Sequence, residues 1–481
     1  MIERAEVALG GFAVDLFETG HPVARRQPIK KFRAPADLTG DPLRIASATP
    51  LGERVRLIFS DGEVREADPL APPGADLDVI VYNASHVLTM KEPSNVPLGR
   101  VDHACVGVRG GRVVFVGHQT ELEAAGEIGP KTLRIDAGGG IITPGLIDPH
   151  THPVFGGARA GEFAMRAAGK TYQEIHASGG GIFSTVRATR DAAPESLLAG
   201  ARTRLSRMLS WGTTTCEGKS GYALMPSGEL ALLGVLAEAS AGHAVDISPT
   251  LLAHALPPEI DREAYIEAFT GDLIRDVVRG SLAESCDVFC DQGAFTIEET
   301  RAILTAAKAS GLAPRVHAEQ LTTTGAAELA AQLGARSADH LEYITESGMV
   351  MMARAGVVAT LLPGAALTLR LPWPPARKLL DHGVRIALGT DCNPGSSMTE
   401  CLPLQMSLAC MQMGMTVEEA WAAVTTNAAR AIGRADLGQV VPGARADLCV
   451  FACDDPAYVP YHYATNHLRC VLKDGQVAWQ A

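Results

Sequence analysis

The sequence lacks the features that mark disulfide-rich, membrane-bound and nucleic-acid-binding proteins. Its ten cysteines form no Cys-x-x-Cys pair and lie mostly in apolar runs, so we expect buried reduced thiols rather than a disulfide framework. It has no long apolar run and no signal-peptide pattern at its start, so we expect a cytoplasmic protein without a membrane partner. The net charge of −12 repels phosphate backbones, which argues against a nucleic-acid partner.

Aromatic residues are also scarce, at 5% of the chain, but 47% of the residues are apolar. This composition excludes a disordered chain and is typical of a well-packed α/β enzyme. A barrel of alternating strands and helices uses about 250 to 300 residues. A chain of 481 residues therefore leaves material for at least one smaller domain.

The two ends of the chain differ from its middle. Residues 1–76 form an extension of unknown role, in which the run 57–64 predicts a small hairpin. Short β-type runs with Gly-Gly and Asp-Gly turns occupy residues 77–142 and return in residues 441–481. We expect these two flanking segments to pair into one composite β-sandwich domain.

The middle of the chain, residues 143–440, alternates strand-like and helix-like segments. Helical spacing of apolar residues is clear over 325–333 and 347–354. After an opening strand near residue 141, we expect strands at 213–217, 245–254, 287–290, 314–318, 337–340, 357–361 and 385–391. Eight such units predict an α/β fold of the (β/α)₈ TIM-barrel type, whose reactive groups lie at the carboxyl ends of its strands.

The first strand of this barrel carries a His-x-His pair. Ile141, Ile142, Leu146 and Ile147 predict one buried strand, and a period of two places His150 and His152 on the same side. A single histidine is more often a core or surface residue than a ligand. A His-x-His pair at the polar end of an apolar strand, however, is a common first half of a metal site.

Three further strands end in ligand-type side chains. His317 ends the fifth strand, His340 the sixth and Asp391 the eighth. Three imidazoles and a carboxylate, from His150, His152, His317 and Asp391, suit one ion of borderline hardness. No lysine at a strand end has to serve as a carboxylated bridge, so we expect one ion rather than two. The sequence thus predicts a mononuclear metal site.

These residues also carry a family resemblance. The run Pro144–His152, the late His317, His340 and Asp391 and the closing Gly443–Leu448 resemble the amidohydrolase superfamily. Within it, the chain resembles the imidazolonepropionase family from about Leu77 to the C-terminus. The motifs that carry this closer resemblance are Val154–Arg159, Gly179–Val186, Lys219–Tyr222, Ala335–Leu341 and Thr390–Ser397.

The resemblance implies a reaction, a cofactor and an assembly. The reaction is hydrolysis of the ring amide of the small molecule 4-imidazolone-5-propanoate to N-formimidoyl-L-glutamate in histidine degradation. The cofactor is one Zn or Fe ion per chain, and the assembly is a homodimer. The hydrolysis of a ring amide needs a base and a group that stabilises the oxyanion. We expect Asp391 to be both metal ligand and base, and His340 to stabilise the developing oxyanion. The alternative for His340 is a supporting role, hydrogen-bonded to a neighbouring residue.

Substrate-binding residues follow from charge and from the resemblance. An acidic protein needs a local cation for the substrate carboxylate, and Arg159, on the loop after His152, has a guanidinium of suitable shape. By the resemblance, Tyr222, His254, Gln320, Asn393, Gly395 and Ser396 complete the pocket. Packing of Tyr222 and capping of the third strand by His254 are the alternatives from the residues alone.

Two other classes of function have to be considered. A deaminase related to this superfamily would use the same metal constellation, but such enzymes usually carry Glu where this chain has Gln320. Glutamine cannot exchange a proton at neutral pH, which makes deamination the weaker alternative. A non-catalytic scaffold is disfavoured because every metal and acid–base position is filled.

Overall fold

The structure, a computed structural model, describes residues 76–481 except 92–95, 126, 171–173, 175–178 and 435. Before residue 76 it describes the backbone of six strands in two antiparallel three-stranded sheets. These strands are β1 (Val7–Gly10), β2 (Ala13–Leu16), β3 (Lys30–Arg33), β4 (Ile45–Leu51), β5 (Arg54–Phe59) and β6 (Val64–Ala67). The pairing of β5 with β6 gives the strands of the expected hairpin, whose turn lies outside the described residues.

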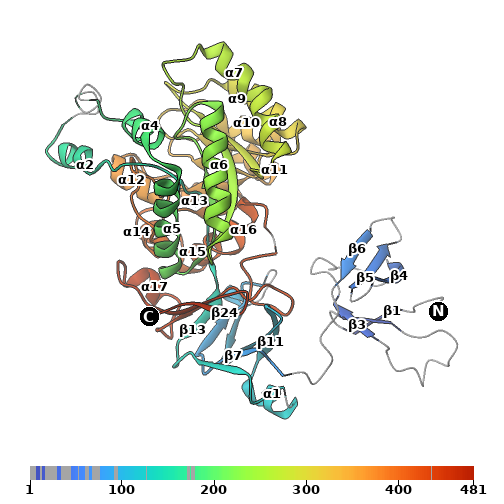
Figure 1. Ribbon diagram of the computed structural model, residues 1–481. Helices are drawn as coiled ribbons and strands as arrows, with labels where there is room; N and C mark the ends of the chain where they lie inside the picture. Colours follow the sequence, from blue (N-terminus) through green and yellow to red (C-terminus); the bar gives the residue numbers. More distant parts are fainter. Residues whose placement is uncertain are drawn as a thin grey trace.

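A barrel of eight parallel strands dominates the molecule, with the strands arranged in chain order (Figure 1). The strands are β14 (Leu146–Asp148), β15 (Thr213–Lys219), β16 (Asp246–Ala253), β17 (Ser285–Cys290), β18 (Ala313–Ala318), β19 (Ser337–His340), β20 (Val358–Leu361) and β21 (Ile386–Leu388). Beyond the ends of the first and last strands, Thr151 bridges Cys392, and the Asp391 N–H donates to the His150 carbonyl at 3.0 Å. The expected (β/α)₈ barrel is confirmed.

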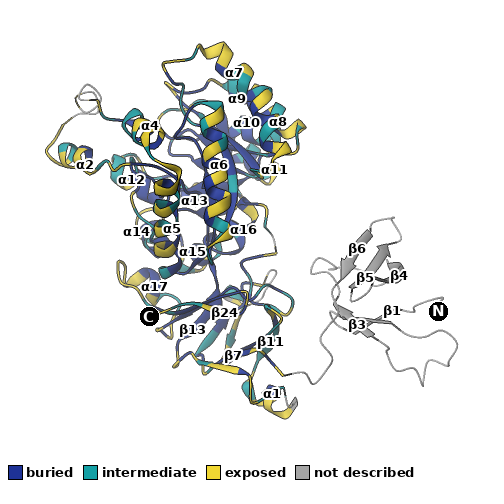
Figure 2. Ribbon diagram, viewed as in Figure 1, coloured by how far each residue is buried: buried dark blue, intermediate teal, exposed yellow. Residues whose placement is uncertain are grey.

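Helices surround this barrel, with their apolar faces toward the strands and exposed residues outward, as α5 and α6 show in Figure 2. Local signals fix several helix ends. At the start of α9, Thr296 and Glu299 form a reciprocal capping box, and α10 ends at Gly334 in the left-handed conformation. The helices that connect or follow the strands are α2 (Ala160–Ala167), α4 (Ile182–Asp191), α5 (Pro194–Ser210), α6 (Pro226–Ala241), α7 (Arg262–Thr270), α8 (Asp272–Arg279), α9 (Ile297–Ala309), α10 (Ala326–Leu333), α11 (Glu346–Ala355), α12 (Pro363–Leu369), α13 (Ala376–Asp381), α14 (Leu402–Gln412), α15 (Val417–Ala423) and α16 (Thr426–Ala431).

Two sheets below the barrel in Figure 1 form the composite sandwich. One has the order β11-β10-β7-β12, and the other has the order β24-β23-β22-β13-β8-β9. Their strands are β7 (Val79–Tyr82), β8 (His86–Leu88), β9 (Arg100–Asp102), β10 (Cys105–Arg109), β11 (Arg112–Gly117), β12 (Leu133–Asp136), β13 (Ile141–Pro144), β22 (Leu448–Phe451), β23 (Leu468–Lys473) and β24 (Gln476–Gln480). Early residues such as Val81 and Val106 share a core with late ones such as Leu448 and Leu472. The two flanking segments therefore build one β unit.

The junction between sandwich and barrel corrects one expectation. The run from Ile141 to Ile147 was expected to be a single strand, but it divides into β13 of the sandwich and β14 of the barrel. Gly145 separates them, and a Cβ at this position would lie 2.3 Å from the Thr214 hydroxyl. A change of sheet thus falls where only a glycine fits, inside a run that is apolar throughout.

The cysteines and helices agree with the other expectations from composition. All ten cysteines are free, and all except Cys410 are buried. None of the helices in the described part of the chain is long and apolar enough to cross a membrane.

Candidate active site

The carboxyl ends of the first and last barrel strands are tied together by a buried carboxylate. Asp148 ends β14 and accepts hydrogen bonds from the Thr390 hydroxyl at 2.6 Å and the Thr390 N–H at 3.1 Å. Burial raises the pKa of Asp148 to about 7, although these hydrogen bonds favour its charged form. The segments that carry His150 and Asp391 are thereby held side by side.

Asp391 lies between the two histidines that follow the first barrel strand, β14. Its Oδ1 is 3.4 Å from His152 Nε2 and 3.6 Å from His150 Nε2, while its Oδ2 accepts from the Ser396 hydroxyl at 2.9 Å. The backbone of Asp391 is left-handed, with φ of 51°, a conformation that costs energy in a residue with a side chain. His150, His152 and Asp391 each offer one donor atom within 4.8 Å of the others.

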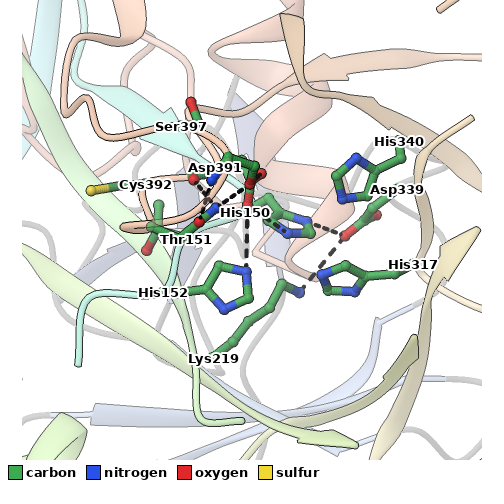
Figure 3. Close-up of polar contacts among 12 residues, drawn as sticks. His150, Thr151, His152, Lys219, His317, Asp339, His340, Asp391, Cys392 and Ser397 are labelled. Carbon is green, nitrogen blue, oxygen red and sulfur yellow. Dashed lines mark hydrogen bonds and ion pairs between the residues drawn. The ribbon is translucent and has the colours of Figure 1, made fainter. Parts of the chain in front are cut away.

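His317 and His340 complete the ring of imidazoles. His150 lies 4.5 Å from the ring centre of His317 and 5.6 Å from that of His340. These three also offer donor atoms within 4.8 Å of one another, so His150 belongs to both groups. Figure 3 shows the four imidazole rings pointing toward one another, with Asp391 above His152. The structure brings the four predicted ligands together, and it places His340 in the same cluster.

Two carboxylates behind the rings orient them. His150 Nδ1 lies 2.6 Å from Asp339 Oδ2, and His317 Nδ1 lies 2.8 Å from Asp287 Oδ2. Because a carboxylate accepts and does not donate, His150 Nδ1 carries the proton in its hydrogen bond with Asp339. The charge of Asp287 favours the proton on His317 Nδ1 as well, although these two atoms lack the alignment of a hydrogen bond. The remaining nitrogen then presents a lone pair. His150 Nε2 is buried and has no hydrogen-bond partner among the described residues.

The charge states of Asp391 and His340 suit acid–base chemistry. Burial raises the pKa of Asp391, but the hydrogen bond from His152 and the nearby imidazoles outweigh it, so the pKa falls below its ordinary value. For His340, burial lowers the pKa, but the Glu342 carboxylate, 3.9 Å from His340 Nδ1, outweighs it, so the pKa rises. The cluster therefore pairs an ionised carboxylate with an imidazole inclined to hold a proton.

Arg159 reaches the site from the start of α2. Its Nε and Nη2 both donate to Glu162 Oε2, at 2.9 and 2.7 Å. Its Nη1 lies against the turn after Asp391, since a Cβ on Gly395 would be 2.2 Å from that atom. The other oxygen of Glu162 accepts from the Gly181 N–H and the Ser184 hydroxyl. The guanidinium is thus held in one orientation by a buried partner.

The turn after Asp391 is shaped by Asn393. The Asn393 Oδ1 accepts from the N–H groups of Gly395 and Ser396 at 2.8 and 2.9 Å, and its Nδ2 donates to the Asp391 carbonyl at 2.7 Å. Together with the bond from Ser396 to Asp391, these contacts connect the predicted substrate-binding turn to a predicted ligand.

Tyr222 and His254 lie on the other side of His152. The ring of His254 stacks on His152 at 5.5 Å between centres, and Tyr222 is 5.3 Å from His254. His254 Nδ1 is 3.1 Å from the Gly221 carbonyl, which can only accept its proton. Gln320 is buried and follows β18, next to Leu321, whose N–H donates to Asp291 at 2.7 Å.

Several functional residues were not anticipated from the sequence. Asp287 and Asp339 lie inside apolar strands, and only the position of Asp339 next to His340 pointed to it. Glu229 accepts from the N–H groups of Gly221, Ala223 and Leu224, and so fixes the loop that carries Tyr222. In the sequence, Glu229 is only an acidic residue in the first turn of a helix, a pattern too common to indicate a particular role.

A buried lysine also lies at a strand end, where none had been assigned a role. Lys219 ends β15, and its Nζ contacts Glu217 Oε1 at 2.7 Å and Asp287 Oδ2 at 2.6 Å. Burial lowers the pKa of Lys219, but the surrounding carboxylates outweigh it and the pKa rises. Such an ammonium is suited to ion pairing and not to carboxylation.

Comparisons with known proteins agree with this geometry. The amidohydrolase family model matches residues 141–478. The imidazolonepropionase of Anaeromyxobacter sp. (strain K) is 47% identical over 409 residues, which cover 84% of this chain and 96% of that protein. The imidazolonepropionase of Myxococcus xanthus (strain DK1622) is 44% identical over 410 residues, which cover 84% of this chain and 97% of that protein.

Solved structures share the fold at lower identity. An adenosine deaminase from Xanthomonas campestris with bound zinc superposes with a TM-score of 0.65 and 18% identity, over 84% of this chain and 93% of that one. An atrazine chlorohydrolase from Arthrobacter aurescens TC1 complexed with zinc gives a TM-score of 0.64 and 17% identity, over 83% of this chain and 94% of that one. At these identities the likeness concerns the architecture alone.

Proposed function

The chain belongs to the imidazolonepropionase family of amidohydrolases, and from this premise we propose how its residues divide the work of catalysis. The reaction is hydrolysis of the ring amide C–N bond of 4-imidazolone-5-propanoate, which yields N-formimidoyl-L-glutamate in histidine degradation. The observation that carries the proposal is the convergence of His150, His152, His317 and Asp391, with His340 beside them, at the carboxyl ends of the barrel strands.

The donor set fits a bound metal ion. His150 Nε2 is buried, has no hydrogen-bond partner among the described residues and lies in both groups of converging donors. We assign His150, His152, His317 and Asp391 as the ligands of one Zn or Fe ion, because imidazole nitrogens with one carboxylate suit either metal. When bound, the ion supplies Lewis acidity that lowers the pKa of water and polarises the ring carbonyl.

Asp391 is the proton carrier. It is ionised at neutral pH, and its Oδ1 faces the imidazoles while Ser396 holds Oδ2. The carboxylate can accept the proton of the attacking water and later deliver it to the ring nitrogen that leaves. The left-handed backbone at Asp391 fixes the orientation of this carboxylate before the substrate binds.

His340 stabilises the charge that develops on the carbonyl oxygen. Its ring carries at least one N–H in either charge state, and it lies 5.6 Å from His150 and 5.3 Å from His317 between ring centres, where that N–H can donate to the carbonyl oxygen. Gln320, after β18, presents an amide that can bond a ring N–H or carbonyl without exchanging a proton. We therefore assign Asp391 and His340 to proton transfer and charge stabilisation, and Gln320 to positioning.

The propionate of the substrate is assigned to Arg159. Because Nε and Nη2 are taken by Glu162, the Nη1 edge against Gly395 is the one that faces the Asn393–Ser396 turn. A carboxylate bound there would contact Arg159, Gly395 and Ser396 together. Tyr222 and His254, which pack around His152, would then enclose the ring at the other side.

We also propose that the protein is a cytoplasmic homodimer. Phe163 on α2 is 65% exposed and Leu367 on α12 is 52% exposed, and the two helices are joined by a bond from Arg166 to the Thr368 carbonyl at 3.4 Å. Neighbouring exposed apolar side chains favour burial against a second copy. Sedimentation equilibrium should give twice the chain mass, and replacing both side chains by Ser should give a monomer.

The direct test is turnover of freshly prepared imidazolonepropionate. The ring chromophore should disappear and formimidoylglutamate should accumulate in equal amount. Ammonia is measured in parallel with amino-substituted heterocycles as substrates. Ammonia release from these rings without imidazolone hydrolysis would overturn the proposed reaction in favour of deamination.

A further inference from the structure

Lys219 is a fully buried cation that takes no part in the reaction assigned above. It begins the Lys219–Tyr222 motif, and its side chain is 0% exposed inside the barrel. An isolated ammonium in such a place would be very costly, so its partners define what it does. Those partners are Glu217 at 2.7 Å, Asp287 at 2.6 Å and Asp339 at 3.7 Å.

Two of these partners are the carboxylates that orient ligand histidines. Asp287 Oδ2 faces both Lys219 Nζ and His317 Nδ1, at 2.6 and 2.8 Å. Asp339 Oδ2 faces His150 Nδ1 at 2.6 Å and Lys219 at 3.7 Å. Figure 3 shows the Lys219 ammonium beside His317, with a dashed line to Asp339. A single side chain from β15 thus connects residues from β17, β18 and β19 with His150, which follows β14.

The charges of this cluster require Lys219. Three carboxylates, from Glu217, Asp287 and Asp339, are compensated by Lys219 and by Arg315, which donates to Asp339 at 3.1 Å. Among the described residues, Lys219 is the one lysine or arginine within ion-pair distance of Asp287. Without the ammonium, the Asp287 and Asp339 carboxylates would repel each other and lose their fixed orientation.

We propose that Lys219 is a positioning residue for the metal centre, which holds Asp287 and Asp339 where each fixes the proton-bearing side of one ligand histidine. The role rests on the proposed ligation by His150 and His317. Its consequence is that loss of Lys219 weakens metal binding, because the two Nε2 lone pairs are no longer held toward one point. A purely structural lysine would instead stabilise the fold and leave metal affinity unchanged.

The chain offers a matched control in Lys473, a second buried lysine with two carboxylate partners. Its Nζ lies 2.9 Å from Asp246, 2.8 Å from Asp447 and 3.1 Å from the Thr214 carbonyl. These contacts join β23 to the amino-terminal ends of β15 and β16, at the opposite end of the strands from the site. Removing this ammonium also takes a buried cation away from two carboxylates. Neither of these carboxylates contacts a predicted metal ligand.

The experiment compares zinc affinity in full-length Lys219→Met and Lys473→Met. Each protein is stripped of metal, and its zinc dissociation constant is measured by competition with a chromophoric chelator, alongside circular dichroism and the melting temperature of the metal-free form. Lys219→Met should bind zinc at least about tenfold more weakly than wild type, as expected for the loss of a group that supports metal ligands. Lys473→Met should stay within about twofold and lose only melting temperature. Equal zinc affinity of Lys219→Met and wild type would overturn the proposal.

Two further arms keep the test decisive. If Lys219→Met is insoluble, Lys219→Gln, which is neutral but retains an N–H donor, is held to the same tenfold criterion. In a double-mutant cycle with Asp287→Asn, the combined loss of zinc affinity should be smaller than the product of the single losses, because both changes act through His317. A combined loss equal to that product would contradict action through Asp287.

Imidazolone turnover is followed in the same samples. Wild type that binds zinc without turnover would overturn the proposed reaction, and the zinc comparison would still decide the role of Lys219.

Discussion

Two charge clusters of the same composition, one fully buried and one partly exposed, lie at different levels of the barrel. The barrel cluster consists of Glu217, Lys219, Asp287, Arg315 and Asp339, and the junction cluster consists of Asp246, Arg445, Asp447, Lys473 and Asp474. Each contains one lysine, one arginine and three carboxylates. Their difference lies in what the carboxylates touch besides the cations.

In the barrel cluster the carboxylates face the imidazoles of His150 and His317. In the junction cluster they face backbone and cations that join the sandwich to the barrel, as when Arg445 bonds Asp246 and Asp447. Side chains of the barrel cluster are at most 1% exposed, whereas Asp246 is 34% exposed. A buried ion network therefore acts on a site only through the groups that its carboxylates contact outside the network, and charge alone does not mark a site.

Metal removal should separate the two clusters most strongly. A chelator should abolish turnover, because the predicted metal ligands contact the barrel cluster and the reaction depends on the metal. Added zinc or iron should restore turnover. Elemental analysis of the purified protein should give about one ion per chain. Two ions per chain would contradict the single site, and turnover that survives complete removal of metal would contradict the proposed mechanism.

Matched carboxylate changes should give the next largest contrast. Asp391→Asn should lower kcat/KM by several orders of magnitude, since it removes the base and a predicted ligand together. Asp447→Asn, in the junction cluster, should lower the melting temperature and leave kcat/KM close to wild type. Steady-state kinetics with metal analysis of both variants checks this. A comparable loss of kcat/KM in the Asp447 variant would remove the functional distinction between the two ends.

Matched arginine changes test the substrate side. Arg159→Ala should cost about 2–4 kcal/mol in kcat/KM with metal content intact, because the propionate loses its cation. A substrate analogue without the carboxylate should react equally poorly with the variant and the wild type. Arg445→Ala should reduce stability without this cost. Loss of metal from Arg159→Ala would show that the residue supports the structure of the site instead.

A smaller effect is expected at Gln320. Gln320→Glu should keep kcat/KM within about tenfold of wild type, because either side chain presents an acceptor oxygen to a ring N–H. Ring opening and ammonia release are assayed together on wild type and variant. New ammonia release by the variant from aminated heterocycles would show that this position selects between hydrolysis and deamination.

The smallest effect concerns acid stability at the junction cluster. Burial raises the pKa of Asp246, but Lys473 and Arg445 outweigh it, so the folded pKa lies below the ordinary value. Such a group contributes stability above its ordinary pKa, and that stability is lost as the pH falls through the folded pKa. Lys473→Met should therefore shift the acid-unfolding midpoint, followed by circular dichroism, to higher pH. An unchanged midpoint would mean that Arg445 alone compensates Asp246.

Much of this architecture was predictable because strand ends and apolar runs are local. His317 lies near the end of an apolar strand, and the Asp391 turn has its own sequence signature, so both could be assigned from their neighbours. The change of sheet at Gly145 could not, since the residues on both sides are equally apolar.

The supporting carboxylates were missed for a different reason. The role of Asp287 follows from the folded barrel, in which β17 lies between β16 and β18. There Asp287 contacts Lys219, which precedes it in the chain, and His317, which follows it. A charged residue within a strand cannot be given a role from the sequence until its partners in the folded protein are known. Contacts between strands therefore carried the information that the sequence pattern lacked.

The pairing of β13 with β22 also sets an order of events during synthesis. Ile141 pairs with Phe451 and Pro144 with Leu448, so this edge of β13 must wait until almost the whole chain has left the ribosome. The barrel strands, each paired with the next along the chain, can assemble as they emerge. We expect the barrel to form first and the C-terminal strands to close the sandwich last, so that a ribosome stalled before residue 448 would display a barrel beside an open, aggregation-prone sheet edge.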